Sequence, residues 1–210
     1  HNQGIVINAD STTTSKLVVE GTFDVSEDIY YPVTAQDMVI RTLTGVDAKT
    51  VTISADVDVA DILNARGSGE IVVAAGTTLT VGTDVVNKDE NGNDLSDTVS
   101  FQIKGTMTVD GNMVTDATVF SDESLHVTGT MSGDLTIGDA KNVGYAEIGT
   151  ITGDVVVANG ELYVTEELDT SSVKASEEGT IEFASDATIG TKATDLFQCG
   201  RPDLHRHRHP

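Results

Sequence analysis

Two segments of this chain can be laid over each other at a spacing of twenty residues. Residues 129–137 read Gly-Thr-Met-Ser-Gly-Asp-Leu-Thr-Ile, and residues 149–157 read Gly-Thr-Ile-Thr-Gly-Asp-Val-Val-Val. In both, a Gly-Thr step and a Gly-Asp step lead into alternating apolar residues. A period near 20 residues that carries short strands and their turns is typical of one coil of a β-solenoid.

Short apolar-x-apolar triplets recur around these two segments. They are Leu125-His126-Val127, Leu135-Thr136-Ile137, Val155-Val156-Val157, Leu162-Tyr163-Val164 and Ile181-Glu182-Phe183. This alternation indicates strands with one buried face, and no segment sustains the 3.6-residue period of a helix. The one short stretch with helical character is 61–66, which Gly67-Ser68-Gly69 terminates.

We therefore predict an all-β protein, a parallel β-solenoid (β-helix) with a less regular β-rich N-terminal region. The alternative is a tandem β-sandwich, because antiparallel sandwiches also place short strands every eight to twelve residues. The two folds differ in one relationship. In a solenoid Leu135 and Val155 stack directly over each other.

The chain divides into three parts by composition. Residues 1–68 contain an N-terminal strand, a Ser/Thr linker at 11–15 and an irregular β region. Residues 69–198 form the predicted solenoid, interrupted by a polar hairpin insertion at 85–99. Residues 199–210 are a basic His/Arg tail that we expect not to fold with the rest.

The charge balance limits the partners of the chain. The formal net charge is −22, with 12 basic and 34 acidic residues, and the tail from 201 holds three of the five Arg. Nucleic-acid binding by the body is excluded, because phosphate contacts need Lys and Arg. No apolar run is long enough to cross a bilayer, so we expect no membrane insertion.

Two further features bear on the compartment. Cys199 is the single cysteine, so no internal disulfide forms. The chain begins at His1 rather than Met, which we interpret as a signal peptide removed before that residue. We therefore expect an extracellular or cell-surface protein, with the acidity reflecting either high salt or cation binding.

The strongest metal candidate is the centre of the hairpin insertion. Asp89, Asn91, Asn93 and Asp94 offer oxygen ligands in a turn, and the first residues resemble an EF-hand loop for Ca²⁺. Asp94 stands where that loop requires Gly, and Ser100 stands where it requires Glu. Calcium binding and a solvated hairpin tip are thus both open.

Other polar positions have structural and functional interpretations. Asp134 and Asp154 are equivalent in the two matched segments and form either an aspartate ladder or corner turns. His126 occupies the outward position of a triplet. In the tail, His205, His207 and His209 alternate and would chelate Zn²⁺ or Ni²⁺ on an extended strand.

Catalytic signatures are scarce, and we predict that the chain is not an enzyme. The body holds one interior His, so no Ser-His-Asp set can be assembled. Carboxylates are plentiful, which keeps a carbohydrate-binding or carbohydrate-cleaving β-helix as an alternative. Such a protein would use an acidic face with Ca²⁺ and Tyr30, Tyr31 or Tyr163 as stacking surfaces.

Residues 105–190, with their Gly-Thr and Gly-Asp coils, resemble the parallel β-helices of bacterial and archaeal surface proteins. They are also similar to bactofilins, which are polymer-forming β-helical cytoskeletal proteins. The bactofilin resemblance implies end-to-end polymerisation without nucleotide. The first 68 residues and the hairpin insertion depart from that family, and no functional residue carries over from either group.

The function we predict is that of a structural, self-assembling subunit of a filament, surface layer or adhesin stalk. The end coils of a solenoid expose strand edges that are either covered or used for stacking onto another copy. Ile5, Val6 and Ile7 would be the donor strand between subunits, giving a homo-oligomer or homopolymer. The alternatives are the carbohydrate-directed β-helix and a bactofilin-like cytoskeletal polymer.

Overall fold

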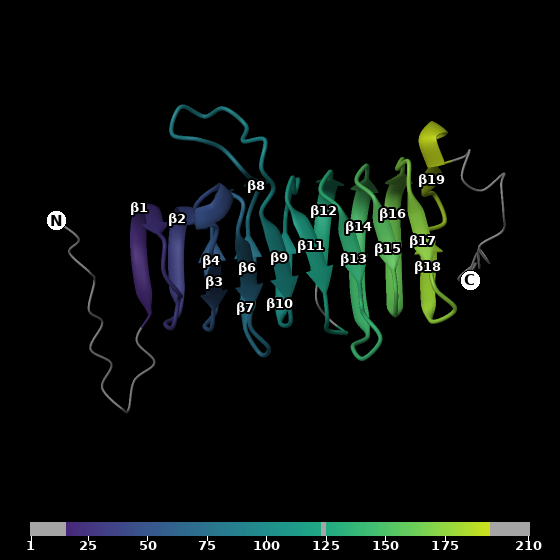
Figure 1. Cartoon of the computed structure of the whole chain (residues 1–210), viewed down its shortest axis with the longest axis horizontal. Coiled ribbons are helices and arrows are strands. Elements are labelled where there is room, and N and C mark those ends of the chain that lie inside the picture. Colours follow the sequence, from purple (N-terminus) through teal and green to yellow (C-terminus); the bar gives the residue numbers. More distant parts are fainter. Residues whose placement is uncertain (1–15, 123–124, 194–210) are drawn as a thin grey trace.

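The computed structural model describes residues 16–122 and 125–193, and the fold is given for these residues. It is a β-solenoid of about 9 turns, with 54% strand and 3% helix. The coils stack side by side along the long axis of the molecule, from β1 to β19 (Figure 1). Every pairing between named strands is parallel, which confirms the predicted fold and excludes the antiparallel sandwiches.

The elements are, in chain order, β1 (Leu17–Val25), β2 (Val33–Arg41), the 3-10 turn η1 (Gly45–Asp47), β3 (Thr50–Ile53), β4 (Val57–Val59), β5 (Leu63–Arg66), β6 (Glu70–Val73), β7 (Thr78–Val81), β8 (Val85–Val86), β9 (Ser100–Ile103), β10 (Thr106–Val109), β11 (Asp116–Val119), β12 (Leu125–Met131), β13 (Leu135–Ile137), β14 (Gly144–Ile151), β15 (Val155–Val157), β16 (Gly160–Leu168), β17 (Val173–Ala175), β18 (Gly179–Phe183) and β19 (Thr188–Ile189). A helical turn follows at 191–193.

Each coil has three faces. The long strands bend and serve two of them: the start of β2 pairs with β4, whereas its end pairs with β5. The first face runs from β1 through β4, β7 and β10 to β18, and the second contains β5, β8 and β19. The third face is a separate seven-stranded sheet, from β3 to β17.

The core consists of side chains stacked in columns, one from each coil. On the third face Ala117, Leu135 and Val155 lie in direct register, with at most 2% of each side chain exposed. The predicted stacking of Leu135 on Val155 is therefore confirmed. Because each coil contributes only a few inward residues, Val, Ile, Leu, Met and Ala, together with Phe101, fill the interior without Trp.

The glycines of the matched segments have a steric role at the corner between the second and third faces. A Cβ added to Gly153 would lie 2.1 Å from the carbonyl oxygen of Gly133, and one added to Gly133 would lie 2.0 Å from that of Thr115. Neighbouring coils approach so closely here that only Gly fits. The repeated Gly-Asp step therefore marks a corner of the coil.

The solenoid begins well before residue 69. Residues 16–68 already supply strands to both sheets, and their inward side chains belong to the same continuous core. The helical turn predicted for 61–66 is wrong, because Leu63–Arg66 is strand β5, paired with β2 and β8. Pairing on both sides outweighs the weak helix propensity of so short a segment.

The hairpin insertion predicted at 85–99 is shorter than expected at both ends. β8 and the buried Val99 remain part of the coil, whereas residues 87–98 project from it (Figure 1). Lys88 and Asp94 form an antiparallel bridge within the projecting part. We refer to residues 87–98 as the excursion.

Candidate functional site

The N-terminal end of the described solenoid presents an unpaired strand edge. Among residues 16–122 and 125–193, β1 pairs with β2 alone. The Leu17 N–H donates to the Pro32 carbonyl, 2.9 Å away, on the β2 side. Because successive N–H groups of a strand point to opposite sides, those of Val18 and Glu20 face outward. Such an edge can accept a further strand.

The side chains of β1 cover the core only partly. Its burial alternates between intermediate and exposed along the whole strand. Leu17, Phe23 and Val25 pack against the core without being buried by it. A strand in the interior of the solenoid, such as β9, instead buries every second residue completely. The apolar surface of β1 is therefore left half-covered by the described residues.

Exposed large apolar side chains also gather toward this end. Six of the nine in the described residues precede Leu63. These six are Val18, Tyr30, Tyr31, Leu43, Val46 and Ile62. Val46 is fully exposed, and Tyr30 and Val18 are 66% and 65% exposed. Exposed large apolar side chains are therefore more frequent in the first coils than in the rest of the described solenoid.

The predicted assembly residues Ile5, Val6 and Ile7 lie outside the described residues, as do residues 199–210 with Cys199 and the alternating histidines.

At the opposite end of the solenoid, β17, β18 and β19 are the last strands of their faces. There the helical turn at 191–193 follows β19, and its Ala193 is buried in the core.

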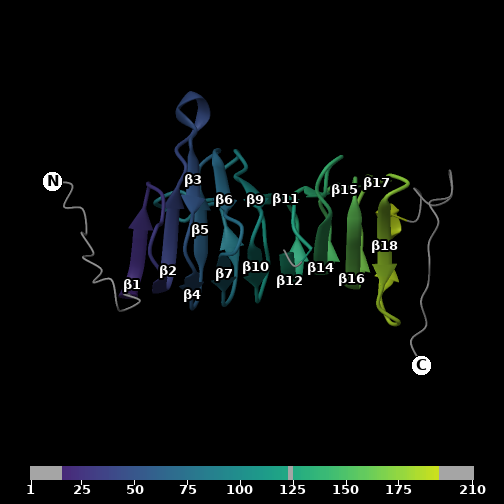
Figure 2. The same ribbon diagram turned by 90° about the horizontal axis from the view of Figure 1, so that it is seen from below.

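Two insertions stand out from one corner of the solenoid. Residues 42–49 with η1 connect β2 to β3, and the excursion connects β8 to β9, so both leave between the second and third faces. The turn around η1 protrudes clearly in Figure 2. Between them Gly67 crosses the corner tightly, because a Cβ there would lie 1.9 Å from the Leu43 carbonyl oxygen. Leu43 itself has a left-handed φ of 60°, which is uncommon for a residue other than Gly.

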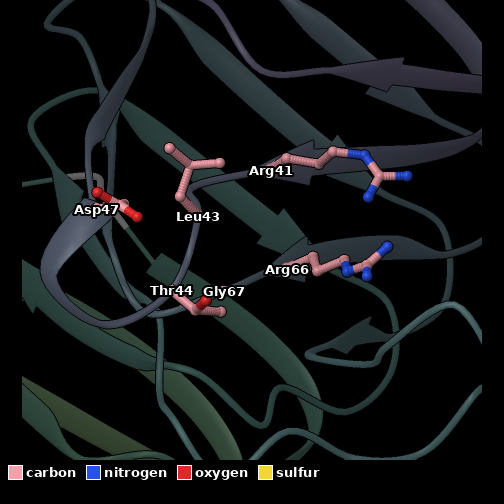
Figure 3. Close-up of a pocket in the computed structure, with 6 residues that line it drawn as sticks. All are labelled: Arg41, Leu43, Thr44, Asp47, Arg66 and Gly67. Carbon is pink, nitrogen blue, oxygen red and sulfur yellow. The ribbon is translucent and has the colours of Figure 1, made fainter.

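Arg41 and Arg66 lie in register beneath these insertions and line a pocket of about 430 Å³ (Figure 3). Asp24 of β1 accepts two hydrogen bonds from Arg41, both 2.6 Å, and this pairing raises the pKa of Arg41. Glu90 of the excursion reaches both arginines, at 3.3 Å from Arg66 and 3.8 Å from Arg41. The two cations are thus balanced by carboxylates, and the cluster ties β1 and the excursion to the second face.

The tip of the excursion holds the residues predicted to bind calcium. Asp89 Oδ1 accepts hydrogen bonds from the backbone N–H groups of Asn91 and Asn93, at 2.7 and 2.9 Å, and Oδ2 accepts one from the Asn93 amide at 3.0 Å. These bonds, with the Asn93 side chain first, lower the pKa of Asp89 to about 2. Asp94 faces Lys88 instead, 3.6 Å away. In this conformation three hydrogen bonds from Asn91 and Asn93 hold the Asp89 carboxylate within its own turn.

No group of three or more His, Cys, Asp or Glu side chains converges on a common point within residues 16–122 and 125–193. Of the acid-rich segments, Asp169 pairs with Lys192 at 3.6 Å, and Glu166 accepts a hydrogen bond from Thr150 at 3.3 Å. Glu177 and Glu178 are exposed in the turn before β18. Calcium at the excursion therefore stays a prediction from the sequence.

Asp134 and Asp154 form a ladder, together with Asp116 one coil earlier. Asp116 Oδ1 accepts a hydrogen bond from the N–H of Asp134 at 2.8 Å, and Asp134 Oδ1 accepts one from the N–H of Asp154 at 2.9 Å. Each carboxylate therefore satisfies a backbone donor of the next coil, rather than of its own turn. Burial raises the pKa of Asp116, the hydrogen bond from the Asp134 N–H partly offsets this, and the charge of Asp134 adds to the rise.

His126 faces outward on the first face, as predicted. Its Nδ1 lies 3.8 Å from Glu147, and its ring centroid lies 6.0 Å from that of Tyr145. The Tyr145 hydroxyl donates to Glu147 at 3.4 Å, and burial together with the nearby carboxylates raises the pKa of Tyr145 to about 12. Tyr163 lies on β16 of the next coil, in register with Glu147 of β14. Tyr30 and Tyr31, in the first coil, are far along the axis from Tyr163, so the three tyrosines do not form one stacking surface.

The comparisons with known proteins give no relative: no family model, no curated protein and no solved structure matches this chain. Within the described residues, no helix has the length and apolar character needed to span a membrane.

The pair formed by Arg41 and Arg66 was not singled out from the sequence. That Arg41 and Arg66 are the only arginines before residue 201 was a usable signal, but their adjacency depends on strand register.

Proposed function

We propose that this chain is a structural subunit that assembles with copies of itself through the open edge of β1. The observation that carries the proposal is that β1 is incompletely paired and incompletely buried. Its outward N–H groups lack a partner in the described residues, and its apolar side chains are only half-covered. Strand addition would satisfy both deficits at once, because the added strand brings backbone acceptors and a new layer of side chains.

The N-terminal end is favoured over the C-terminal end for two reasons. The exposed apolar side chains concentrate in the first coils. The C-terminal end instead has Ala193 of the helical turn buried against the core. The segment containing Ile5, Val6 and Ile7 lies ten residues before β1 in the sequence, and we propose it as the donor strand between copies.

A filament, surface layer or adhesin stalk outside the cell is the setting we propose for such a subunit. The strongly acidic composition supports it, because like charge on every copy keeps free subunits soluble until the edges meet. A cytoskeletal polymer of bactofilin type would assemble by the same physics inside the cell. Fractionation of the source cells with an antibody against the chain distinguishes the two settings.

Substitution of Val18 by Pro tests the proposal. Proline removes the outward N–H of Val18 without removing a hydrogen bond to β2. We expect the wild-type chain to form concentration-dependent oligomers in sedimentation velocity and filaments or rings in negative stain. The V18P variant should remain a folded monomer.

The matched control is Val18→Thr, which keeps the N–H and the β-branched shape and should assemble like the wild type. A second blocking variant, Val18→Lys, places a charge on the edge and should also prevent assembly. A wild-type chain that is monomeric at every concentration overturns the proposal. So do V18P and V18K variants that assemble as the wild type does.

A further inference from the structure

A shallow hollow of about 530 Å³ lies on the outer side of the third face, beside the turn 138–143. It was not apparent from the sequence. The side chains that matter for its chemistry are Glu70, Val72, Gln102, Lys104, Phe120 and Asn142. We call this hollow the Lys104 groove.

The register of the strands makes the groove long. Val72 of β6 pairs with Gln102 of β9, and the Phe120 N–H donates to the Ile103 carbonyl at 2.8 Å, which sets Phe120 beside Lys104. The turn at 138–143 belongs to the next coil. Four successive coils thus line the groove, and neighbouring parallel strands are about 4.8 Å apart, so it extends roughly 14 Å along the solenoid axis.

The wall formed by the turn is held by its own hydrogen bonds. Asp139 Oδ1 accepts hydrogen bonds from the N–H groups of Lys141 and Asn142, at 2.7 and 2.8 Å, and these bonds lower the pKa of Asp139. Asn159 of the following coil donates to the Asp139 carbonyl at 3.2 Å. The wall is therefore formed before any ligand arrives, which reduces the entropy cost of binding.

The groove offers both donors and acceptors beside apolar surface. Lys104 forms no ion pair with any described residue and has three N–H donors. The Gln102 amide donates and accepts, and Glu70 accepts. The Asn142 amide nitrogen donates to both Asp139 oxygens at 3.0 Å, so Asn142 offers a ligand its amide oxygen as an acceptor. Phe120 and Val72 supply apolar contact. The lining holds one cation, Lys104, and two anions, Glu70 and Asp139. The Asp139 carboxylate is already bonded within its own turn, so Lys104 and Glu70 remain to meet a ligand and give no strong preference for a charged one.

A ligand that matches this lining needs many groups that both donate and accept hydrogen bonds, apolar faces between them, and no net charge. Hydroxyl groups on a saturated ring meet these requirements. We propose that the Lys104 groove binds a neutral oligosaccharide, with Phe120 packing on a sugar ring and Gln102 and Lys104 bonding its hydroxyl groups. The length of the groove favours several linked sugars over a single one.

The test is affinity electrophoresis of the full chain carrying V18P, so that self-assembly does not affect mobility. Native gels contain hydroxyethyl cellulose, mannan, laminarin, dextran, soluble xylan or, as the charged comparison, polygalacturonate. We expect at least one neutral polysaccharide to retard the protein. The Phe120→Ala and Gln102→Ala variants should weaken that retardation about tenfold, the order expected from loss of one packing or hydrogen-bonding contact.

The matched control is Thr136→Ala, which removes an outward side chain from the same face outside the groove and should bind like the parent. Circular dichroism confirms that each variant is folded, and Lys104→Met supplies a second probe that leaves the core untouched. Absence of retardation by every neutral polysaccharide overturns the proposal. Retardation by polygalacturonate alone, or equal retardation of the folded F120A, Q102A and K104M variants, also overturns it. None of these outcomes bears on assembly through β1.

Discussion

The carboxylate of Asp134 accepts a hydrogen bond from the backbone N–H of Asp154, 2.9 Å away and one full coil later in the chain. The two residues occupy equivalent corners, and Asp116 does the same for Asp134. Side chains of one coil thus satisfy backbone donors of the next, at a corner where the ladder hydrogen bonds are interrupted. This corner stabilises the stack as well as turning the chain.

Replacing Asp134 by Ala should destabilise the protein by about 1 kcal/mol, the typical contribution of one hydrogen bond that leaves a donor without its partner. Asp134→Asn is the control, because its amide oxygen can still accept the bond from Asp154. Urea unfolding measures the free energy of unfolding of both variants. Equal loss of stability in the two variants contradicts the role given to the Oδ1 atom.

Asp116→Asn should raise the thermal midpoint at pH 7 but leave it unchanged near pH 3. Burial raises the pKa of Asp116, and repulsion from Asp134 adds to it, so the ionised form is disfavoured in the folded state. An acid whose folded pKa is raised costs stability above that pKa and nothing below its unfolded value. The Asn side chain removes this cost and keeps the acceptor for Asp134. A gain that persists at pH 3 argues against a charge effect.

Gly153→Ala should destabilise the solenoid severely, by more than about 3 kcal/mol, because its Cβ would lie 2.1 Å from the carbonyl oxygen of Gly133. Gly76→Ala is the matched control. Gly76 has a left-handed φ of 76° but no atom within 4 Å of a new Cβ, so it should lose only about 1 kcal/mol from backbone strain. A similar loss at both sites contradicts close approach of the coils as the reason for Gly153.

The carboxyl of Asp89 should titrate at about pH 2 in a carbon-13 NMR experiment. Asn93→Ala removes the side-chain hydrogen bond that lowers this pKa most, and the midpoint should rise toward the ordinary value near 3.9. Ca²⁺ added at neutral pH tests the calcium prediction in the same spectra. A midpoint that N93A leaves unchanged rules out the turn geometry as its cause.

Deletion of residues 1–15 should leave a folded protein that no longer assembles. The strands and the continuous core of the described residues all lie within the remaining chain, so the circular dichroism spectrum and thermal midpoint should change little. Sedimentation velocity compares the truncated and full-length chains. If both form the same oligomer, Ile5, Val6 and Ile7 are not the donor strand, and only the edge of β1 remains to account for assembly.

The expected resemblance to bactofilins and β-helical surface proteins was drawn from the Gly-Thr and Gly-Asp coils, and the structure shows what the Gly-Asp residues do. Gly133 and Gly153 allow neighbouring coils to touch, and the aspartates that follow bond the next coil. Both roles are general to stacked coils. They specify an architecture, whereas the partner and the ligand that we propose depend on surface residues such as Val18 and Phe120.

Alternating triplets such as Leu135-Thr136-Ile137 determined, by themselves, which side chains face inward, because the two-residue period of a strand fixes that choice locally. The twenty-residue match likewise determined that Leu135 and Val155 share a column. Coil length varies, however: Leu79 and Met107 are paired although 28 residues apart, whereas Met107 and Leu125 are 18 apart. Because the coil length varies, no fixed repeat in the sequence revealed the coils before residue 69. Only the tertiary structure decided that Leu63–Arg66 is a strand, that Arg41 lies over Arg66, and that Phe120 borders Lys104, because parallel pairing joins residues that no local pattern connects.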